Sequence, residues 1–255
     1  MPDPNEKPAV LEPDDITPSQ RSTIASQSTT HDPLKHHGHL PSIKSIVEII
    51  VVVLFVITFI CQPFRIPSES MENTLLVGDF LLVDKVALSP SGHWGWLLPY
   101  RQPQRGEIVI FHYPVDPKQH LIKRIIGMPG DRLRLHNGQV SINHSILEEP
   151  YTTYNPSPFN NFRDNFPSLH NTDPDVTQPW WAQLRTLMDG NELIIPRTDN
   201  PNDLSYFAMG DNRNNSEDSR YWGFVSREAI VGPPLVIYFS MDTRVRWTRL
   251  FKVPR

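Results

Sequence analysis

The sequence predicts a mainly β, antiparallel-sheet domain that follows one N-terminal transmembrane helix and a disordered tail, and that carries an irregular insert. One 16-residue run, Ile46–Cys61, is apolar apart from Glu48 and Thr58. Beyond it, short runs rich in Val, Ile and Phe alternate with turn signals. The 26 prolines, against 12 glycines, concentrate in two segments, which a regular helix would not tolerate.

Composition excludes several classes of protein. A chain of 255 residues with 38% apolar residues can bury a core, and one long apolar run does not make a polytopic membrane protein. The single cysteine, Cys61, cannot form a disulfide within the chain. A net charge of −4 does not suit a strongly basic nucleic-acid binder, so no nucleic-acid partner is expected.

Residues 1–42 are predicted to be disordered. They hold seven prolines and six acidic against three basic side chains, with almost no apolar periodicity. Such a segment buries too little apolar surface to offset the entropy of ordering it. His36, His37 and His39 are read as part of this flexible polar tail, with a metal site as the alternative.

Residues 43–62 are predicted to form one uncleaved transmembrane helix, because about 20 apolar residues cross a bilayer. A cleavable signal peptide is the rival, but it would lie within about the first 15–30 residues and precede a small-x-small site. Lys35 and Lys44 precede the run and Arg65 follows it. The positive-inside rule then makes the tail cytoplasmic and residues 63–255 extracytoplasmic.

The extracytoplasmic part is predicted to be β-rich. Four runs have the length and composition of strands: Asp79–Asp84, Glu107–Tyr113, His120–Ile126 and Pro234–Phe239. Turns are expected at 128–131 and at 136–139, where Asn-Gly is a strong hairpin signal. Residues 150–201 contain eight prolines and are predicted to be a largely irregular insert, in which only Trp180–Met188 has a helical pattern.

The first candidate site follows the apolar run. In an extended chain, Ser68 and Ser70 would lie on the same face. A solvated loop is the alternative, because a lone Ser-x-Ser has little specificity.

The second candidate is Lys123, which lies with Arg124 among aliphatic neighbours in a predicted strand. A buried lysine is costly unless it is paired or neutral, and a neutral lysine is a competent base. The alternative is that both cations extend from an edge strand to water.

The third candidate is the polar segment 210–223, which contains scarcely an aliphatic residue between two apolar stretches. Its acids and arginines are able to form a charge-paired scaffold that fixes a hydroxyl. A plain surface loop and a calcium loop are the alternatives, but the bidentate Glu that ends a calcium loop is missing.

Together these segments resemble the bacterial type I signal peptidase (leader peptidase) family, whose members are membrane-bound proteases with a Ser-Lys dyad. The resemblance rests on three blocks in order: Ile-Pro-Ser-x-Ser-Met at 66–71, Ile-Lys-Arg-x-x-Gly-x-Pro-Gly-Asp at 122–131, and the segment 210–223. Asn73 and Asn214 depart from the family pattern, and neither position carries a catalytic group. The tail and the insert have no clear counterpart.

The resemblance implies a signal-peptidase-like catalytic domain and a role for each candidate residue. Ser70 would be the nucleophile and neutral Lys123 the general base, with the Ser68 hydroxyl and the Ser70 N–H binding the oxyanion. Ser216 would orient the lysine amine. The expected supporting ion-pair residues are Arg124, Asp211, Asp218 and Arg220.

The implied partners are preprotein signal peptides, cleaved after small residues at −1 and −3, and the lipid of the bacterial inner membrane. A monomer without a metal or cofactor is expected. The aromatic segment 93–100 is read equally as a membrane contact or as core. Two other functions stay open: a Ser-Lys protease acting on other substrates, such as a self-cleaving repressor, and an inactive membrane-tethered binding protein.

Overall fold

The structure is a computed structural model that describes residues 43–88, 101–169 and 173–255. The tail predicted to be disordered, 1–42, lies outside the described residues with its three histidines. So does the aromatic segment 93–100, whose two interpretations both stay predictions.

One helix has the length and composition needed to cross a membrane. It comprises α2 (Ile43–Phe55) and a π-helical turn, η1 (Val56–Ile60). These 18 residues have a mean hydropathy of 2.7, and none of them is buried, which gives a length of roughly 27 Å at 1.5 Å per residue. The helix ends two residues before the predicted boundary, because Cys61 and Gln62 pair as the first residues of a strand. The chain divides into two compact units after Val47, inside this helix.

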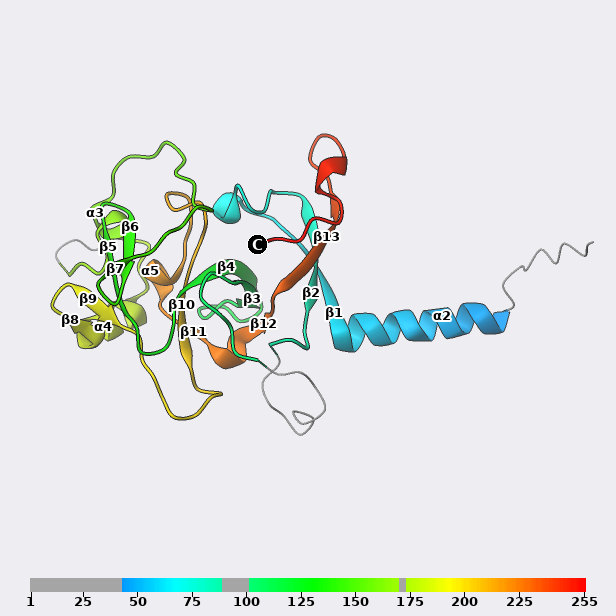
Figure 1. Cartoon of the computed structure of the whole chain (residues 1–255), viewed down its shortest axis with the longest axis horizontal. Helices are drawn as coiled ribbons and strands as arrows, with labels where there is room; N and C mark the ends of the chain where they lie inside the picture. The colour runs from blue at the N-terminus through cyan, green and yellow to red at the C-terminus, as the bar shows by residue number, and fades with distance from the viewer. Residues whose placement is uncertain (1–42, 89–100, 170–172) are drawn as a thin grey trace, which may run out of the picture. The chain divides into compact units, whose positions relative to one another are not determined.

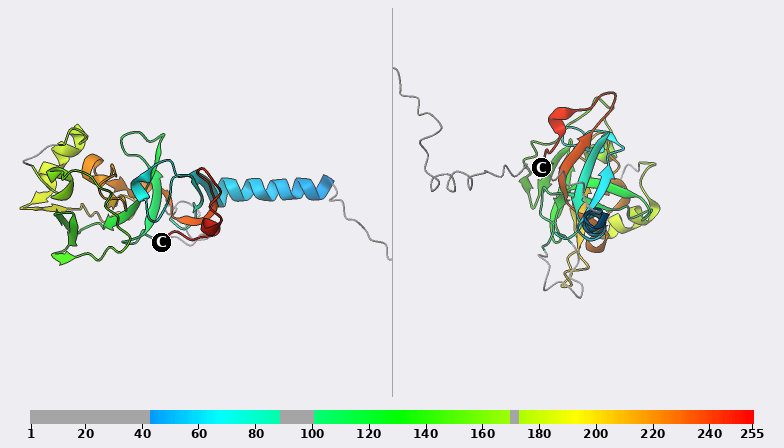
Figure 2. Two further views of the ribbon diagram at one scale, coloured as in Figure 1. Left: turned by 90° about the horizontal axis from the view of Figure 1, so that it is seen from above. Right: turned by 90° about the vertical axis from the view of Figure 1, so that its right-hand side faces the viewer.

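The first sheet has three antiparallel strands in the order β1 (Cys61–Arg65), β2 (Asp79–Asp84) and β13 (Pro234–Ser240). Figure 2 shows them side by side in its right-hand view. Burial alternates strictly along β2, so Leu81 and Val83 face the core. Both predicted runs at 79–84 and 234–239 are therefore strands.

The second sheet has five antiparallel strands. Their order is β11 (Val225–Ser226), β10 (Ser205–Met209), β4 (His120–Gly127), β3 (Ile108–His112) and β12 (Ile230–Gly232). The predicted strands at 107–113 and 120–126 are confirmed to within a residue or two. β4 is the central strand, and its last six residues are all buried.

The third sheet is antiparallel, in the order β7 (Ser145–Ile146), β6 (Gln139–Ile142), β5 (Arg132–His136), β9 (Glu192–Ile194) and β8 (Met188–Asp189). The β5–β6 hairpin turns at Asn137 and Gly138, both with positive φ, which is the conformation that favours Asn-Gly. In Figure 1 this sheet lies beside α3 and α4.

The insert is irregular between short elements of its own. α3 (Asn161–Asp164) and α4 (Gln178–Leu187) are its helices, and β8 and β9 are its strands. The helix predicted at 180–188 is therefore present. Trp180 fixes α4 to the rest of the domain, because its ring is buried and its N–H donates to the Arg220 carbonyl at 3.0 Å.

Two apolar clusters lie on the two faces of the β3–β4 pair. The smaller cluster contains Ile108 and Ile122 and packs against the first sheet through Leu81 and Ile237. The larger one extends from Val109 to the third sheet and α4. The remaining described helices are single turns: η2 (Glu69–Met71), α5 (Ser219–Trp222), η3 (Arg227–Ala229) and η4 (Trp247–Arg249).

Candidate active site

Ser70 lies in a tight turn and not in the extended segment that the sequence predicts. Residues 69–71 form the 3₁₀ turn η2, and only Ser68 before it is extended. Met71 and Leu75 are fully buried and hold this turn against the smaller core cluster. The Ser68 and Ser70 hydroxyl oxygens are nevertheless 3.4 Å apart. The expectation of an extended chain was wrong, whereas the two hydroxyls do lie together.

Lys123 reaches Ser70 from the central strand β4. Its Nζ donates a hydrogen bond to the Ser70 Oγ at 2.5 Å, and the two residues are only 3% and 7% exposed. Because β4 is flanked by β3 and β10 and Lys123 is buried, the lysine does not extend from an edge strand into solvent, and the edge-strand alternative is excluded. Burial lowers the pKa of Lys123 to about 8, although the nearby Asp218 carboxylate opposes that shift.

Arg124 points to the opposite face of β4 and pairs with Asp211. The guanidinium donates to the two carboxylate oxygens at 2.8 and 2.6 Å, and both side chains are buried. The Thr74 hydroxyl also donates to Asp211, at 2.6 Å. Asp211 therefore connects β4, the polar segment 210–223 and the residues that follow Ser70.

Asp218 and Arg220 form a second buried ion pair. Two bonds of 2.8 Å join them, and Asp218 also accepts from the Gly210 N–H at 3.1 Å. Burial by itself would raise the pKa of Asp218, but the charge and hydrogen bonds of Arg220 hold it below its usual value. This carboxylate is therefore an anion beside the buried amine of Lys123.

Ser216 is near the site but lacks the expected hydrogen bond. Its buried hydroxyl has no hydrogen-bond partner within the described residues, so the predicted contact with Lys123 is absent. A Cβ on Gly210 would lie 2.3 Å from that hydroxyl and 2.4 Å from the Ser70 carbonyl oxygen. Gly210 therefore separates Ser216 from Ser70, and any side chain at position 210 would displace one of them.

Sequence reasoning missed a short strap at the start of the insert, residues 149–153. Glu149 accepts two hydrogen bonds from the buried guanidinium of Arg213, at 2.8 and 2.5 Å. The Tyr151 ring lies 3.8 Å from the Arg124 guanidinium carbon, which is a cation–π contact. Nothing in the sequence Glu-Pro-Tyr-Thr-Thr predicts these contacts, because they form only through tertiary packing.

The strap continues into the polar segment. Thr153 forms a parallel bridge with Asn212, and the Asn212 N–H donates to the Ser70 carbonyl at 3.1 Å. The structure thus brings together every predicted site residue, although without the Ser216 hydrogen bond. Within the described residues, no group of three or more His, Cys, Asp or Glu side chains is placed to hold a metal ion.

Comparison with known proteins points to one family. The family model described as "Signal peptidase, peptidase S26" matches residues 40–239. A protein named Signal peptidase I from Aquifex aeolicus is 35% identical over 226 residues, covering 77% of this chain and 84% of that protein. A Signal peptidase I from Helicobacter pylori is 31% identical over 266 residues, covering 82% of this chain and 91% of that protein. A solved structure of a signal peptidase I from Enterococcus faecalis, 30% identical, covers 52% of this chain and 97% of that chain, with a TM-score of 0.36.

Proposed function

Because this chain belongs to the signal peptidase family, peptidase S26, we propose that it is a membrane-anchored serine endopeptidase that removes N-terminal signal peptides from exported preproteins. The observation that carries the proposal is the buried hydrogen bond of 2.5 Å between Lys123 and Ser70. A hydroxyl beside an amine of lowered pKa is the arrangement that an activated nucleophile needs.

The reaction begins when the neutral Lys123 amine takes the proton of the Ser70 hydroxyl. The Ser70 Oγ then attacks the carbonyl carbon of the scissile peptide bond. The resulting ammonium returns its proton to the leaving nitrogen as the C–N bond breaks. Water, deprotonated by the same amine, releases the signal peptide from Ser70.

The Ser68 hydroxyl and the Ser70 backbone N–H bind the oxyanion that forms during each attack. Two observations support this assignment. The Ser68 hydroxyl lies 3.4 Å from the nucleophile oxygen, and the Ser70 N–H donates no hydrogen bond within the described residues. Loss of one such donor reduces kcat by about 10²–10³-fold in other proteases, which is the effect expected for Ser68→Ala.

Four charged residues hold Ser70 and Lys123 in place. The Arg124–Asp211 pair joins β4 to the segment after Ser70, and Asp218–Arg220 supports Gly210 and the lysine. Ser216 remains a positioning candidate, because its hydroxyl is buried against Gly210 and has no hydrogen-bond partner among the described residues.

The substrate binds as an added strand, and shallow pockets accept small residues at −1 and −3. The helix Ile43–Ile60 anchors the enzyme in the bacterial inner membrane, with residues 1–42 as a disordered cytoplasmic tail and 63–255 as the extracytoplasmic catalytic domain. Anchoring concentrates the enzyme beside a substrate that is itself membrane-embedded. We assign it as a monomer in contact with lipid.

The test is cleavage of a preprotein with an Ala-x-Ala site by the whole chain in detergent. We expect Ser70→Ala and Lys123→Met to abolish cleavage. The matched controls are the exposed Ser145→Ala and Lys118→Met, which should cleave as the wild type does. Cleavage retained by either active-site variant would overturn the dyad.

A further inference from the structure

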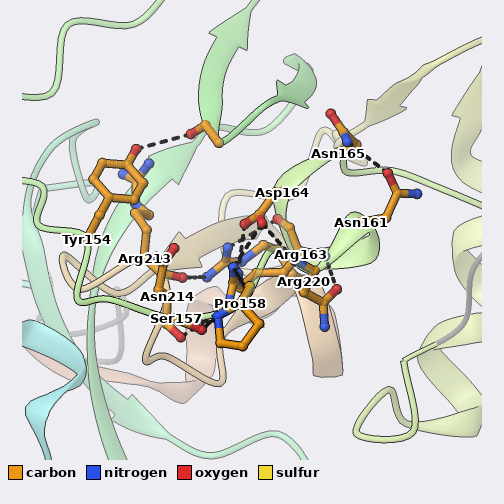
Figure 3. Close-up of polar contacts among 12 residues, drawn as sticks. Tyr154, Ser157, Pro158, Asn161, Arg163, Asp164, Asn165, Arg213, Asn214 and Arg220 are labelled. Carbon is orange, nitrogen blue, oxygen red and sulfur yellow. Dashed lines mark hydrogen bonds and ion pairs between the residues drawn. The ribbon is translucent and has the colours of Figure 1, made fainter.

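Two hollows flank the side chain of Tyr154 in the first part of the insert. One has a volume of about 430 Å³ and is lined by Tyr154, Phe159 and Asn214, among others. The other has a volume of about 490 Å³, and Tyr154 and Asn137 line both. Figure 3 shows Tyr154 and Asn214 near the Arg163–Asp164 ion pair. Tyr154 and Phe159 are 51% and 66% exposed, so two aromatic side chains on this surface are accessible to solvent.

We call these two hollows the groove; the segment 154–159, which contributes to their lining, begins near the turn that carries Ser70. The Asn155 side chain donates to Glu72, two residues after Ser70, at 2.9 Å. The Asn214 side chain, from the polar segment, donates to the Asn155 carbonyl at 3.0 Å. The segment 154–159 therefore leads away from the turn that carries Ser70, and the hollows lie along it.

The groove offers hydrogen-bonding groups without a net charge. Its two lining acids are already paired, Asp164 with Arg163 and Glu149 with Arg213. Within the described residues, the backbone N–H groups of Tyr154 and Asn155 donate no hydrogen bond. Two free backbone N–H groups beside exposed aromatic side chains are able to hydrogen-bond to the carbonyl groups of an extended peptide.

We propose that this groove binds the mature part of the preprotein, the residues that follow the scissile bond. The inference rests on the proposed function and adds a substrate subsite to it. The polarity of the two parts of the substrate favours the mature part. The apolar segment of a signal peptide remains in lipid, whereas the chain beyond the cleaved bond is exported into water. An extended polar segment there pairs with the free amides and covers the two exposed rings.

The experiment compares two substrates that share one signal peptide and one cleavage site. The long substrate carries its full mature part, and the short one ends at the first mature residue. The enzymes are the whole chain and its variants Tyr154→Ala, Phe159→Ala and the double variant, all in detergent. Ile146→Ala is the matched control, because Ile146 is 64% exposed and lines neither hollow.

We expect the double variant to raise KM for the long substrate by about five- to tenfold with kcat unchanged, and to leave the short substrate unaffected. Tyr154→Phe, which keeps the ring, should behave as the wild type does. Equal effects on both substrates, no effect on either, or the same effect from Ile146→Ala would each overturn the subsite. A wild-type enzyme that cleaves neither substrate would contradict the proposed function itself.

Discussion

At the scale of the residue, the proposed mechanism makes the pH dependence of activity depend on the protonation of Lys123. Only the neutral amine accepts a proton, and its pKa is about 8. We therefore expect kcat/KM to rise with pH and to reach half its maximum near pH 8.

The exposed Glu217 raises the pKa of Lys123 through its charge, so Glu217→Gln should move the midpoint of the pH profile to lower pH. The matched control is Glu228→Gln, whose exposed carboxylate is not among the groups that shift Lys123; a midpoint that stays or rises in Glu217→Gln would count against the assignment.

Burial of Lys123 also lowers the free energy of unfolding of the protein. Below pH 8 the folded protein carries a buried ammonium, and the unfolded chain keeps its proton up to its usual pKa near 10.5. We expect Lys123→Met to raise the free energy of unfolding at pH 7 by about 3 kcal/mol. Because the unfolded chain binds more protons between pH 8 and 10.5, wild-type stability increases with pH there and the advantage of the variant should disappear. Tryptophan-monitored unfolding of both chains in detergent measures this; a variant less stable at pH 7 would refute it.

At the scale of the element, the strap 149–153 joins the insert to the active site. Glu149→Ala would leave the buried guanidinium of Arg213 unpaired, and breaking such a pair costs about 3–5 kcal/mol. We expect a loss of that order in the free energy of unfolding, together with reduced cleavage. Its neighbour Glu148 is exposed, so Glu148→Ala should change neither quantity. Equal losses in the two variants would show that the pair with Arg213 does not support the site.

Strands were predictable where local pattern and burial agree. β2, β3, β4 and β13 are short runs rich in Val, Ile, Leu or Phe, which the sequence reveals directly. The burial of Lys123 was not predictable in this way. β4 is a central strand because it pairs with β10, which lies some 80 residues further along the chain. Likewise β9 has only three residues, and it is a strand because β5 pairs with it. Proposing the dyad needed the family resemblance as well as the residues.

At the scale of the whole molecule, the proposed orientation is open to a direct test. A protease added outside spheroplasts should digest residues 63–255 and should leave an epitope fused before residue 1 intact. Permeabilised cells, in which the epitope becomes accessible, are the control. Loss of the epitope in intact spheroplasts would reverse the assigned topology.

One consequence concerns the pairing of β4 with β3, where Val109 lies opposite Lys123 and Ile108 opposite Arg124. Neighbouring side chains on a strand point to opposite faces, so a slip of one residue would exchange the two cations. A guanidinium stays protonated at any pH an enzyme meets. Facing Ser70, it would have no lone pair with which to accept a proton. In the proposed mechanism, register fidelity during folding is thus a catalytic requirement: a misregistered molecule with every residue intact would be inert.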